Sequence, residues 1–374
     1  MLNTDMTPYK HLLFTYWYNA PGLTPWNQTG DWVKGDPSKT NAVAYANGGG
    51  SIVVDATFSS KTIPPNALVE VRFVASGFPS GPVYSDWEAA PRTGPSTFTA
   101  SNVTSLDSLL TIYNCIFQPD FITGMELAWE FKVDNGTTKA VTGSSVNPFY
   151  VTRGGGAGAY HTVIHTGCAA AKYHSVEDAV FDAIWGEFSG DDICIQTVMM
   201  QNGAVILNPD GKLYYYGIPV PGSTLNPPES VARKEKSYTT KSLLQHKDGT
   251  CYAWARFLTD VLRAQGIDAV AKKVTITEEF VTWGGNTDRL VALVADVDDF
   301  GQRTKGIHHG AKPLEAQWAD HAVVKYNGSY YDSSYGKKYD TFRDMIDAFS
   351  FYYPNQPYIP GTQAEDEWLI ESNL

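Results

Sequence analysis

A glycine-rich run divides the chain into two stretches with different residue patterns. The run RGGGAGAY, residues 153 to 160, has four glycines within its first six residues. Such a density of glycine favours neither a helix nor a strand, because ordering a glycine backbone costs the most conformational entropy. We therefore predict a linker at 153–159 between a domain at 1–152 and a domain at 160–374, and the 374 residues are enough for two domains.

The stretch before the run has the pattern of β-strands. Short segments rich in β-branched and aromatic residues alternate with clusters of Gly, Pro and Asn, at 51–58, 67–75, 109–117, 125–133 and 147–152. The apolar stretch HLLFTYWYNA near the start indicates a further strand, since it lacks the flanks of a signal peptide. The Asn135-Gly136 pair predicts a turn. This stretch predicts an immunoglobulin-like β-sandwich, whose ligand could be a polysaccharide or a protein.

The stretch after the run mixes helices with strands. A helix is predicted over 174–189, with Ser175 as N-cap and apolar residues at Val176, Ala179, Val180, Ala183 and Ile184. Strands are predicted within 193–219, where Asn-Gly and Asp-Gly pairs indicate turns, and at 269–276, 289–297 and 321–332. A last helix is expected around 341–353. A helix followed by a run of strands indicates an α+β domain.

Composition narrows the choice of partners. A net charge of −12 repels a phosphate backbone, so nucleic-acid binding is not expected. No apolar run reaches the roughly 18–20 residues of a membrane-spanning helix. Charged residues make up 18%, below the about 25% of an average soluble protein, while Tyr, Trp and Gly are abundant. This balance is typical of extracellular domains, so we expect an extracellular or cell-surface location, with the leader absent from this sequence.

The four cysteines are Cys115, Cys168, Cys194 and Cys251, and no CxxC pair occurs, so a zinc ribbon is not expected. Cys168 and Cys194 flank a helical segment and could form one disulfide. Cys251 has three alternatives: a core side chain, half of a disulfide, or a nucleophile.

Cys251 falls in the first turn of a predicted amphipathic helix, HKDGTCYAWARFLTDVLRAQG, residues 246 to 266. Asp248 or Thr250 can cap this helix and Gly266 can end it. Its apolar stripe consists of Ala255, Leu258, Val261 and Leu262. The N–H groups and the positive dipole end of a first turn stabilise a thiolate and can hold an oxyanion. Gly249 is expected to leave the approach to the sulfur open.

A predicted hairpin supplies a base and its orienting partner. In DHAVVKYNGSYYDSSYG, residues 320 to 336, Asn327-Gly328 is a strong signal for a two-residue turn. That turn pairs Val323 with Asp332, so His321 and Asp332 share a face with a Cβ separation of roughly 5–7 Å. Carboxylate and imidazole can then form a hydrogen bond. The alternative is a surface histidine that happens to lie near an acidic residue.

These two segments resemble the transglutaminase-like superfamily of cysteine enzymes, distant relatives of papain-type proteases. The resemblance rests on GTCYAWARFLTDVLRAQGIDAV and on DHAVVKYNGSYYDSSYG, and its motifs span residues 245 to 336. It implies an α+β domain in which the nucleophile helix packs on an antiparallel sheet. It also implies Cys251 as nucleophile, His321 as general base and acid, and Asp332 as orienting carboxylate. Gln245 sits where papain-like enzymes place an oxyanion glutamine.

The resemblance implies acyl transfer through a thioester on a protein or peptide substrate. Hydrolysis by a peptidase or amidase is the leading expectation, and cross-linking to a lysine amine is the variant reaction. The alternative is a non-catalytic cell-surface binding or structural module that keeps the fold.

Other candidate residues carry weaker predictions. His308 and His309 are adjacent and would point to opposite faces of a strand, so no metal site is expected there, and His308 more plausibly borders the cleft. Trp283 and Trp254 could wall the cleft, although aromatic residues are more often in the core. The acidic segment 295–301 lacks the EF-hand positions, which leaves Ca²⁺ as a weak alternative to no cofactor at all.

Overall fold

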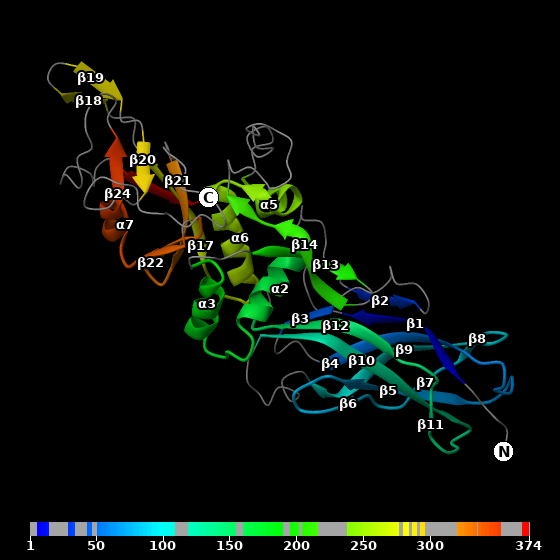
Figure 1. Ribbon diagram of the computed structural model, residues 1–374. Coiled ribbons are helices and arrows are strands. Elements are labelled where there is room, and N and C mark those ends of the chain that lie inside the picture. Colours follow the sequence, from blue (N-terminus) through cyan, green and yellow to red (C-terminus); the bar gives the residue numbers. More distant parts are fainter. Residues whose placement is uncertain are drawn as a thin grey trace. The chain divides into compact units, whose positions relative to one another are not determined.

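A computed structural model gives the structure of most of the chain (Figure 1). It describes residues 6–14, 29–33, 43–46, 51–108, 119–154, 160–189, 195–201, 204–215, 238–276, 280–283, 286–289, 292–295, 320–334, 336–352 and 369–373. Among these residues strands predominate, and the helices all follow residue 160. The chain is therefore an α+β protein, as predicted.

Two β-sheets form from the residues before the glycine-rich run. One has the order β2-β1-β4-β9-β8, and the other has the order β3-β12-β10-β5-β6 with β11 beside β10 and β7 beside β5. The first sheet contains β1 (Thr7–Phe14), β2 (Thr29–Val33), β4 (Ser51–Ser59), β8 (Arg92–Gly94) and β9 (Thr97–Ser108). The second contains β3 (Val43–Ala46), β5 (Val69–Ser76), β6 (Val83–Tyr84), β7 (Glu88–Ala89), β10 (Asp120–Val133), β11 (Lys139–Ala140) and β12 (Ser145–Thr152). Neighbouring strands are antiparallel except for β3 and β12, which are parallel.

Most of the strands predicted in this half are confirmed. The segments 51–58, 67–75, 125–133 and 147–152 correspond to β4, β5, β10 and β12, and HLLFTYWYNA begins in β1. The segment 109–117 lies outside the described residues. A turn does follow β10, but its left-handed residues are Asp134 and Asn135, one position earlier than the Asn-Gly pair predicts. The immunoglobulin-like connection of the strands stays a prediction.

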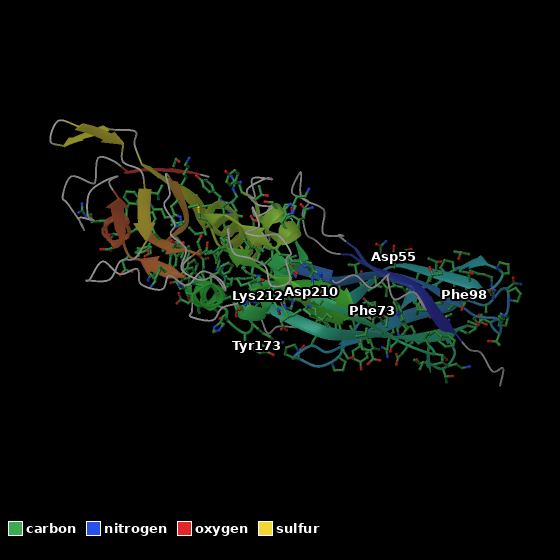
Figure 2. All side chains as sticks on the ribbon, turned by 45° about the horizontal axis from the view of Figure 1, so that its top comes forward. Asp55, Phe73, Phe98, Tyr173, Asp210 and Lys212 are labelled. Carbon is green, nitrogen blue, oxygen red and sulfur yellow. The ribbon has the colours of Figure 1, made fainter. Side chains whose placement is uncertain are left out.

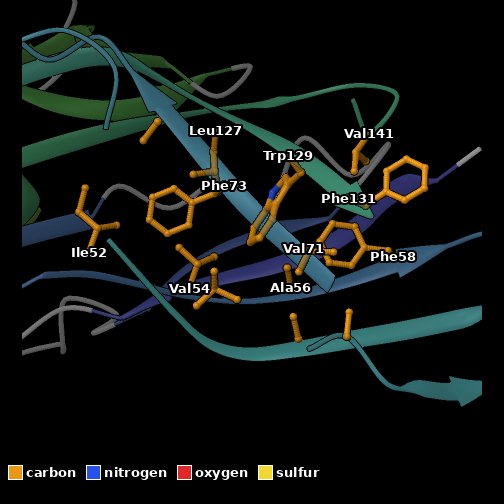
Figure 3. Close-up of a cluster of buried hydrophobic side chains, with 14 of the residues drawn as sticks. Ile52, Val54, Ala56, Phe58, Val71, Phe73, Leu127, Trp129, Phe131 and Val141 are labelled. Carbon is orange, nitrogen blue, oxygen red and sulfur yellow. The ribbon is translucent and has the colours of Figure 1, made fainter. Parts of the chain in front are cut away.

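The two sheets share one hydrophobic core (Figure 3). Along β4 and β5 every second side chain is buried, which is the period of two that a strand imposes. Trp129 of β10 is at the centre, with its ring edge-on to Phe58 at 5.0 Å and to Phe73 at 5.9 Å between centroids. Phe73 and the buried Phe98 of β9 are labelled in Figure 2. Edge-to-face packing of this kind adds about 0.5–1.5 kcal/mol per pair beyond area burial.

Helix α2 (His161–Ala170) was not predicted from the sequence. It lies against β12 and β10, and its Val163, Ile164 and Cys168 are fully buried. The Cys168 thiol donates a hydrogen bond to the carbonyl of Val151 at 3.3 Å. Cys168 is not disulfide-bonded, so the bridge to Cys194 is not formed; Cys194 and Cys115 lie outside the described residues.

A buried contact joins the residues after β12 to the end of helix α6 (Cys251–Ala264). The side-chain Oε1 of Gln265 accepts a hydrogen bond from the backbone N–H of Arg153 at 2.9 Å, and its Nε2 donates to the Cys168 sulfur at 3.4 Å. The backbones of Gly154 and Gly266 are in close contact. A Cβ added to either glycine would lie 2.9 Å from the Cα of the other. No other residue type fits at these two positions without displacing main chain.

A five-stranded antiparallel sheet is the main sheet of the remaining chain. Its order is β23-β22-β21-β17-β25, and its strands are β17 (Val270–Ile276), β21 (Asp320–Tyr326), β22 (Ser329–Asp332), β23 (Lys337–Tyr339) and β25 (Leu369–Asn373). Four smaller pairs accompany it: β13 (Gln196–Gln201) with β14 (Ala204–Lys212), β15 (Tyr214–Tyr215) with β16 (Asp248–Gly249), β18 (Phe280–Trp283) with β19 (Asn286–Arg289), and β20 (Ala292–Ala295) with β24 (Phe349–Tyr352). The strands predicted at 269–276 and 321–332 are confirmed.

The helices differ in detail from the predictions. Helix α3 (Glu177–Gly186) begins after Val176, because the Val176 carbonyl accepts a hydrogen bond from the Val180 N–H. Ser175 is therefore not the N-cap. Val176, predicted as an apolar residue of this helix, is 65% exposed. Helix α5 (Thr240–His246) was not predicted; Thr239 and Ser242 form its capping box. Helix α7 (Phe342–Ala348) ends five residues before the predicted 353, because the aromatic segment that follows forms β24. The predicted turn at Asp210-Gly211 is instead part of β14.

The chain divides into two compact units. The first comprises Met1–Phe181, Val198–Leu207 and Ala264–Ile267, and the second comprises Asp182–Thr197, Asn208–Arg263 and Asp268–Leu374. This division differs from the expected linker at 153–159, because α2 packs on the sheets of the first unit and belongs with them. Residues 155–159 lie outside the described residues. None of the described helices combines the length and apolarity needed to cross a membrane.

Candidate active site

Helix α6 begins at Cys251. The carbonyl of Thr250 accepts the first bond of the helix, from the Trp254 N–H at 3.1 Å, so Thr250 is the N-cap and Cys251 is the first helical residue. The N–H groups of a first turn have no partner within the helix and carry the positive end of its dipole. The sulfur of Cys251 therefore starts from a position where negative charge is favoured.

Apolar packing fixes the rest of α6. The predicted stripe of Ala255, Leu258, Val261 and Leu262 is fully buried. Trp254 is also fully buried and packs against Phe188 and Phe257, so it is a core residue and not a wall of a cleft. The helix ends as predicted at Gly266, whose φ of 72° is left-handed.

Gly249 has a packing role that the sequence did not suggest. It is buried in β16, and a Cβ there would lie 2.9 Å from the side chains of both Ala253 and Leu243. The glycine therefore allows α5 and α6 to approach closely, and an open approach to the sulfur stays a prediction.

The hairpin of β21 and β22 has the predicted register. Tyr326 pairs with Ser329, and Val324 pairs with Tyr331. Asn327 and Gly328 form the turn with φ values of 47° and 84°, both in the left-handed region that a two-residue hairpin turn requires. Within the sheet, His321 is paired with Val274 of β17.

His321 and Asp332 form a buried hydrogen-bonded pair. The Nε2 of His321 lies 2.7 Å from Oδ2 of Asp332, and both side chains are 0% exposed. The other carboxylate oxygen, Oδ1, accepts a hydrogen bond from the Ser334 N–H at 3.0 Å, and the Asp332 carbonyl accepts one from Gly336 N–H at 2.8 Å. The carboxylate is therefore held at both oxygens, which fixes the orientation of the imidazole.

Cys251 completes the group. Its charge acts on the His321 imidazole, and the residue is 4% exposed. Burial lowers the pKa of His321, but the charge of Asp332, then that of Cys251, and the hydrogen bond to Asp332 outweigh it and raise this pKa to about 10. The imidazole thus favours its protonated form beside the Asp332 carboxylate.

The structure describes the other predicted site residues to different extents. Gln245 is on α5 with an exposed side chain, so its role at the oxyanion stays a prediction. Trp283 ends β18, and nothing is described of its side chain. His308, His309 and residues 296–301 of the acidic segment lie outside the described residues. Within the described part of the chain, no three His, Cys, Asp or Glu side chains are close enough to hold a metal.

Ser334 is the site residue that the sequence analysis missed. Its backbone N–H holds Oδ1 of Asp332, an Asx-type turn in which an aspartate accepts from the residue two positions on. The run DSS at 332–334 carried that signal in the sequence.

Searches with this sequence found no matching family model and no matching curated protein. The resemblance to transglutaminase-like enzymes therefore rests on the residues of this chain alone.

Proposed function

We propose that this chain is a cysteine-dependent acyl-transfer enzyme of transglutaminase-like type, acting on amide bonds of a protein or peptide. The observation that carries the proposal is the buried hydrogen bond of His321 with the Asp332 carboxylate, together with the charge of Cys251, at the start of α6, acting on the same imidazole. A nucleophile, a base and a group that orients the base are the three parts that covalent catalysis of this class requires.

In the proposed reaction His321 takes the proton of Cys251, and the raised pKa of His321 supports the imidazolium that results. Cys251 Sγ attacks the amide carbonyl carbon and forms a C–S bond. First-turn N–H groups of α6 stabilise the oxyanion. The C–N bond then breaks, and the leaving amine takes its proton from His321, which leaves an acyl-thioester.

Water or an amine completes the reaction. We favour hydrolysis, in which His321 accepts a proton from water as it attacks the thioester and the thiolate leaves. A lysine amine in place of water would cross-link two proteins. The exclusion of water around the thioester decides between them.

The test compares two buried cysteines. Cys251→Ala should abolish turnover on a panel of casein and small amides, while the matched Cys168→Ala should retain it. Amine release reports hydrolysis, and incorporation of a primary-amine probe reports cross-linking. Thermal melts of both variants show that they are folded. Turnover of Cys251→Ala at the wild-type rate would refute the proposal.

One observation favours a second candidate, a binding or structural module with an idle triad. His321 and Asp332 are 0% exposed and Cys251 is 4% exposed, so little of the site faces solvent. Native alkylation with iodoacetamide at pH 6–7 separates the candidates: selective labelling of Cys251 supports the enzyme, and labelling no faster than that of Cys168 supports the module.

A further inference from the structure

Two histidines of α2 converge on one tyrosine, outside the site described above. His161 and His165 are four residues apart on the helix, which places them on the same face. Nε2 of His161 and Nδ1 of His165 each lie 3.0 Å from the hydroxyl oxygen of Tyr150 on β12. Both imidazole rings stand nearly perpendicular to the phenol ring, at 85° and 90°.

The surroundings keep these rings neutral. Tyr150 is fully buried, whereas His161 and His165 are partly exposed. Burial, with the charge of His165 as a second cause, lowers the pKa of His161 to about 3, and burial lowers the pKa of His165 to about 4. Neutral imidazole, with a free lone pair, is the form that binds metal ions.

We propose that His161, His165 and Tyr150 form a binding site for a divalent transition-metal ion of the zinc and copper class. Imidazole nitrogen suits these ions better than it suits Mg²⁺ or Ca²⁺. The two nitrogen-to-oxygen distances of 3.0 Å are close to the about 3.3 Å between ligands of a tetrahedral ion with bonds of about 2.0 Å. The fourth position would be filled by water.

The proton balance of binding is simple. Each imidazole keeps one proton, on the nitrogen that faces away from the ion, and gives the lone pair of the other nitrogen. The phenol oxygen binds as phenolate and one proton passes to solvent; because burial raises the pKa of Tyr150, the charge of the bound ion has to stabilise this phenolate. No electron transfer is involved.

A hydrogen-bonded network without a metal is the competing explanation. The phenol can donate to one imidazole and accept from the other, which satisfies all three groups. The two explanations differ in what happens when ions are added and when the ligand atoms are removed one at a time.

The experiment is Zn²⁺ titration of the full-length, metal-stripped chain, followed by calorimetry, in a Cys251→Ala background that removes the competing thiol. One ion per chain is expected. His161→Gln or His165→Gln should weaken binding at least about tenfold, equal to about 1.4 kcal/mol. The control His174→Gln, at an exposed histidine just after α2, should leave it unchanged.

A second readout does not depend on the histidine variants being folded. Addition of Cu²⁺ should give a visible phenolate-to-copper absorption band that Tyr150→Phe, which keeps the ring, removes. Absence of Zn²⁺ binding, binding unchanged by both His161→Gln and His165→Gln, or a copper band that survives Tyr150→Phe would overturn the proposal and leave the hydrogen-bonded network.

Discussion

Replacing Asp332 with Asn should return His321 to an ordinary or lower pKa. The substitution removes the carboxylate charge but keeps an amide oxygen that can still accept from the Ser334 N–H, so the loop geometry should survive. The proton on His321 is then favoured by Cys251 alone and opposed by burial. The pKa should fall well below the wild-type value of about 10.

The size of the fall follows from the order of the causes. The influences that raise the pKa of His321 together exceed the increase from 6.5 to about 10, since they also overcome burial. Asp332 raises the pKa of His321 more than Cys251 does. Removing the Asp332 carboxylate should therefore lower the pKa of His321 by about two pH units or more, roughly 3 kcal/mol of lost imidazolium stabilisation. Cys251→Ala should lower this pKa by less.

The assay is NMR titration of ¹³C-labelled histidines, with the His321 signal assigned by its loss in His321→Gln. In the wild type the imidazole should stay charged until the pH rises toward about 10. In Asp332→Asn the midpoint should move below about pH 8, and in Cys251→Ala it should lie between the two. Equal midpoints in the wild type and Asp332→Asn, or a larger fall in Cys251→Ala, would refute the reasoning.

Three further predictions concern stability and reactivity. Gly328→Ala should lower the free energy of unfolding by about 1–2 kcal/mol in denaturant titration, because the φ of Gly328 is 84°. Gly186→Ala, at the end of α3, should be neutral or slightly stabilising. A Cβ meets nothing within 4 Å at either position, so equal effects of the two variants would contradict the backbone argument. Leu258→Ala should cost about 2–5 kcal/mol, since the side chain is fully buried; a cost under 1 kcal/mol would contradict its place in the core. At pH 7 iodoacetamide should alkylate Cys251 faster than Cys168, because burial is the main cause that raises the pKa of the Cys168 thiol to about 12. Peptide mass spectrometry measures both alkylation rates, and a higher rate at Cys168 would be incompatible with this prediction.

The parts of the site that were predictable from the sequence are those that local rules determine. An Asn-Gly pair requires left-handed backbone at both turn positions, and this sets the hairpin register and puts His321 and Asp332 on one face. Likewise the helix of Cys251 has a polar start, a regular apolar stripe and a terminal glycine. These signals act within a few residues, so no knowledge of the rest of the fold was needed.

The elements that were missed depend on distant partners. Helix α2 contains Thr162, Val163, Ile164 and Thr166, whose β-branched side chains disfavour a helix; its burial against β12 decides the outcome. The segment after α7 has helical spacing but pairs with β20 as a strand. Gly211 looked like a turn residue, but it lies in β14 beside Thr197 of β13, where a Cβ would collide with the threonine hydroxyl.

The meeting of Gly154 with Gly266 limits how this protein can be dissected. A shortened chain that starts at residue 160 would retain every proposed catalytic side chain, yet it would lack the main chain that Gly266 contacts just after α6. The side-chain Oε1 of Gln265 would lose the hydrogen bond from the Arg153 N–H, and the Cys168 thiol would lose the Val151 carbonyl as its acceptor. We therefore expect that the segment from residue 160 onward will not fold properly by itself. Fusions or truncations of this protein should keep residues 145–154 together with that segment.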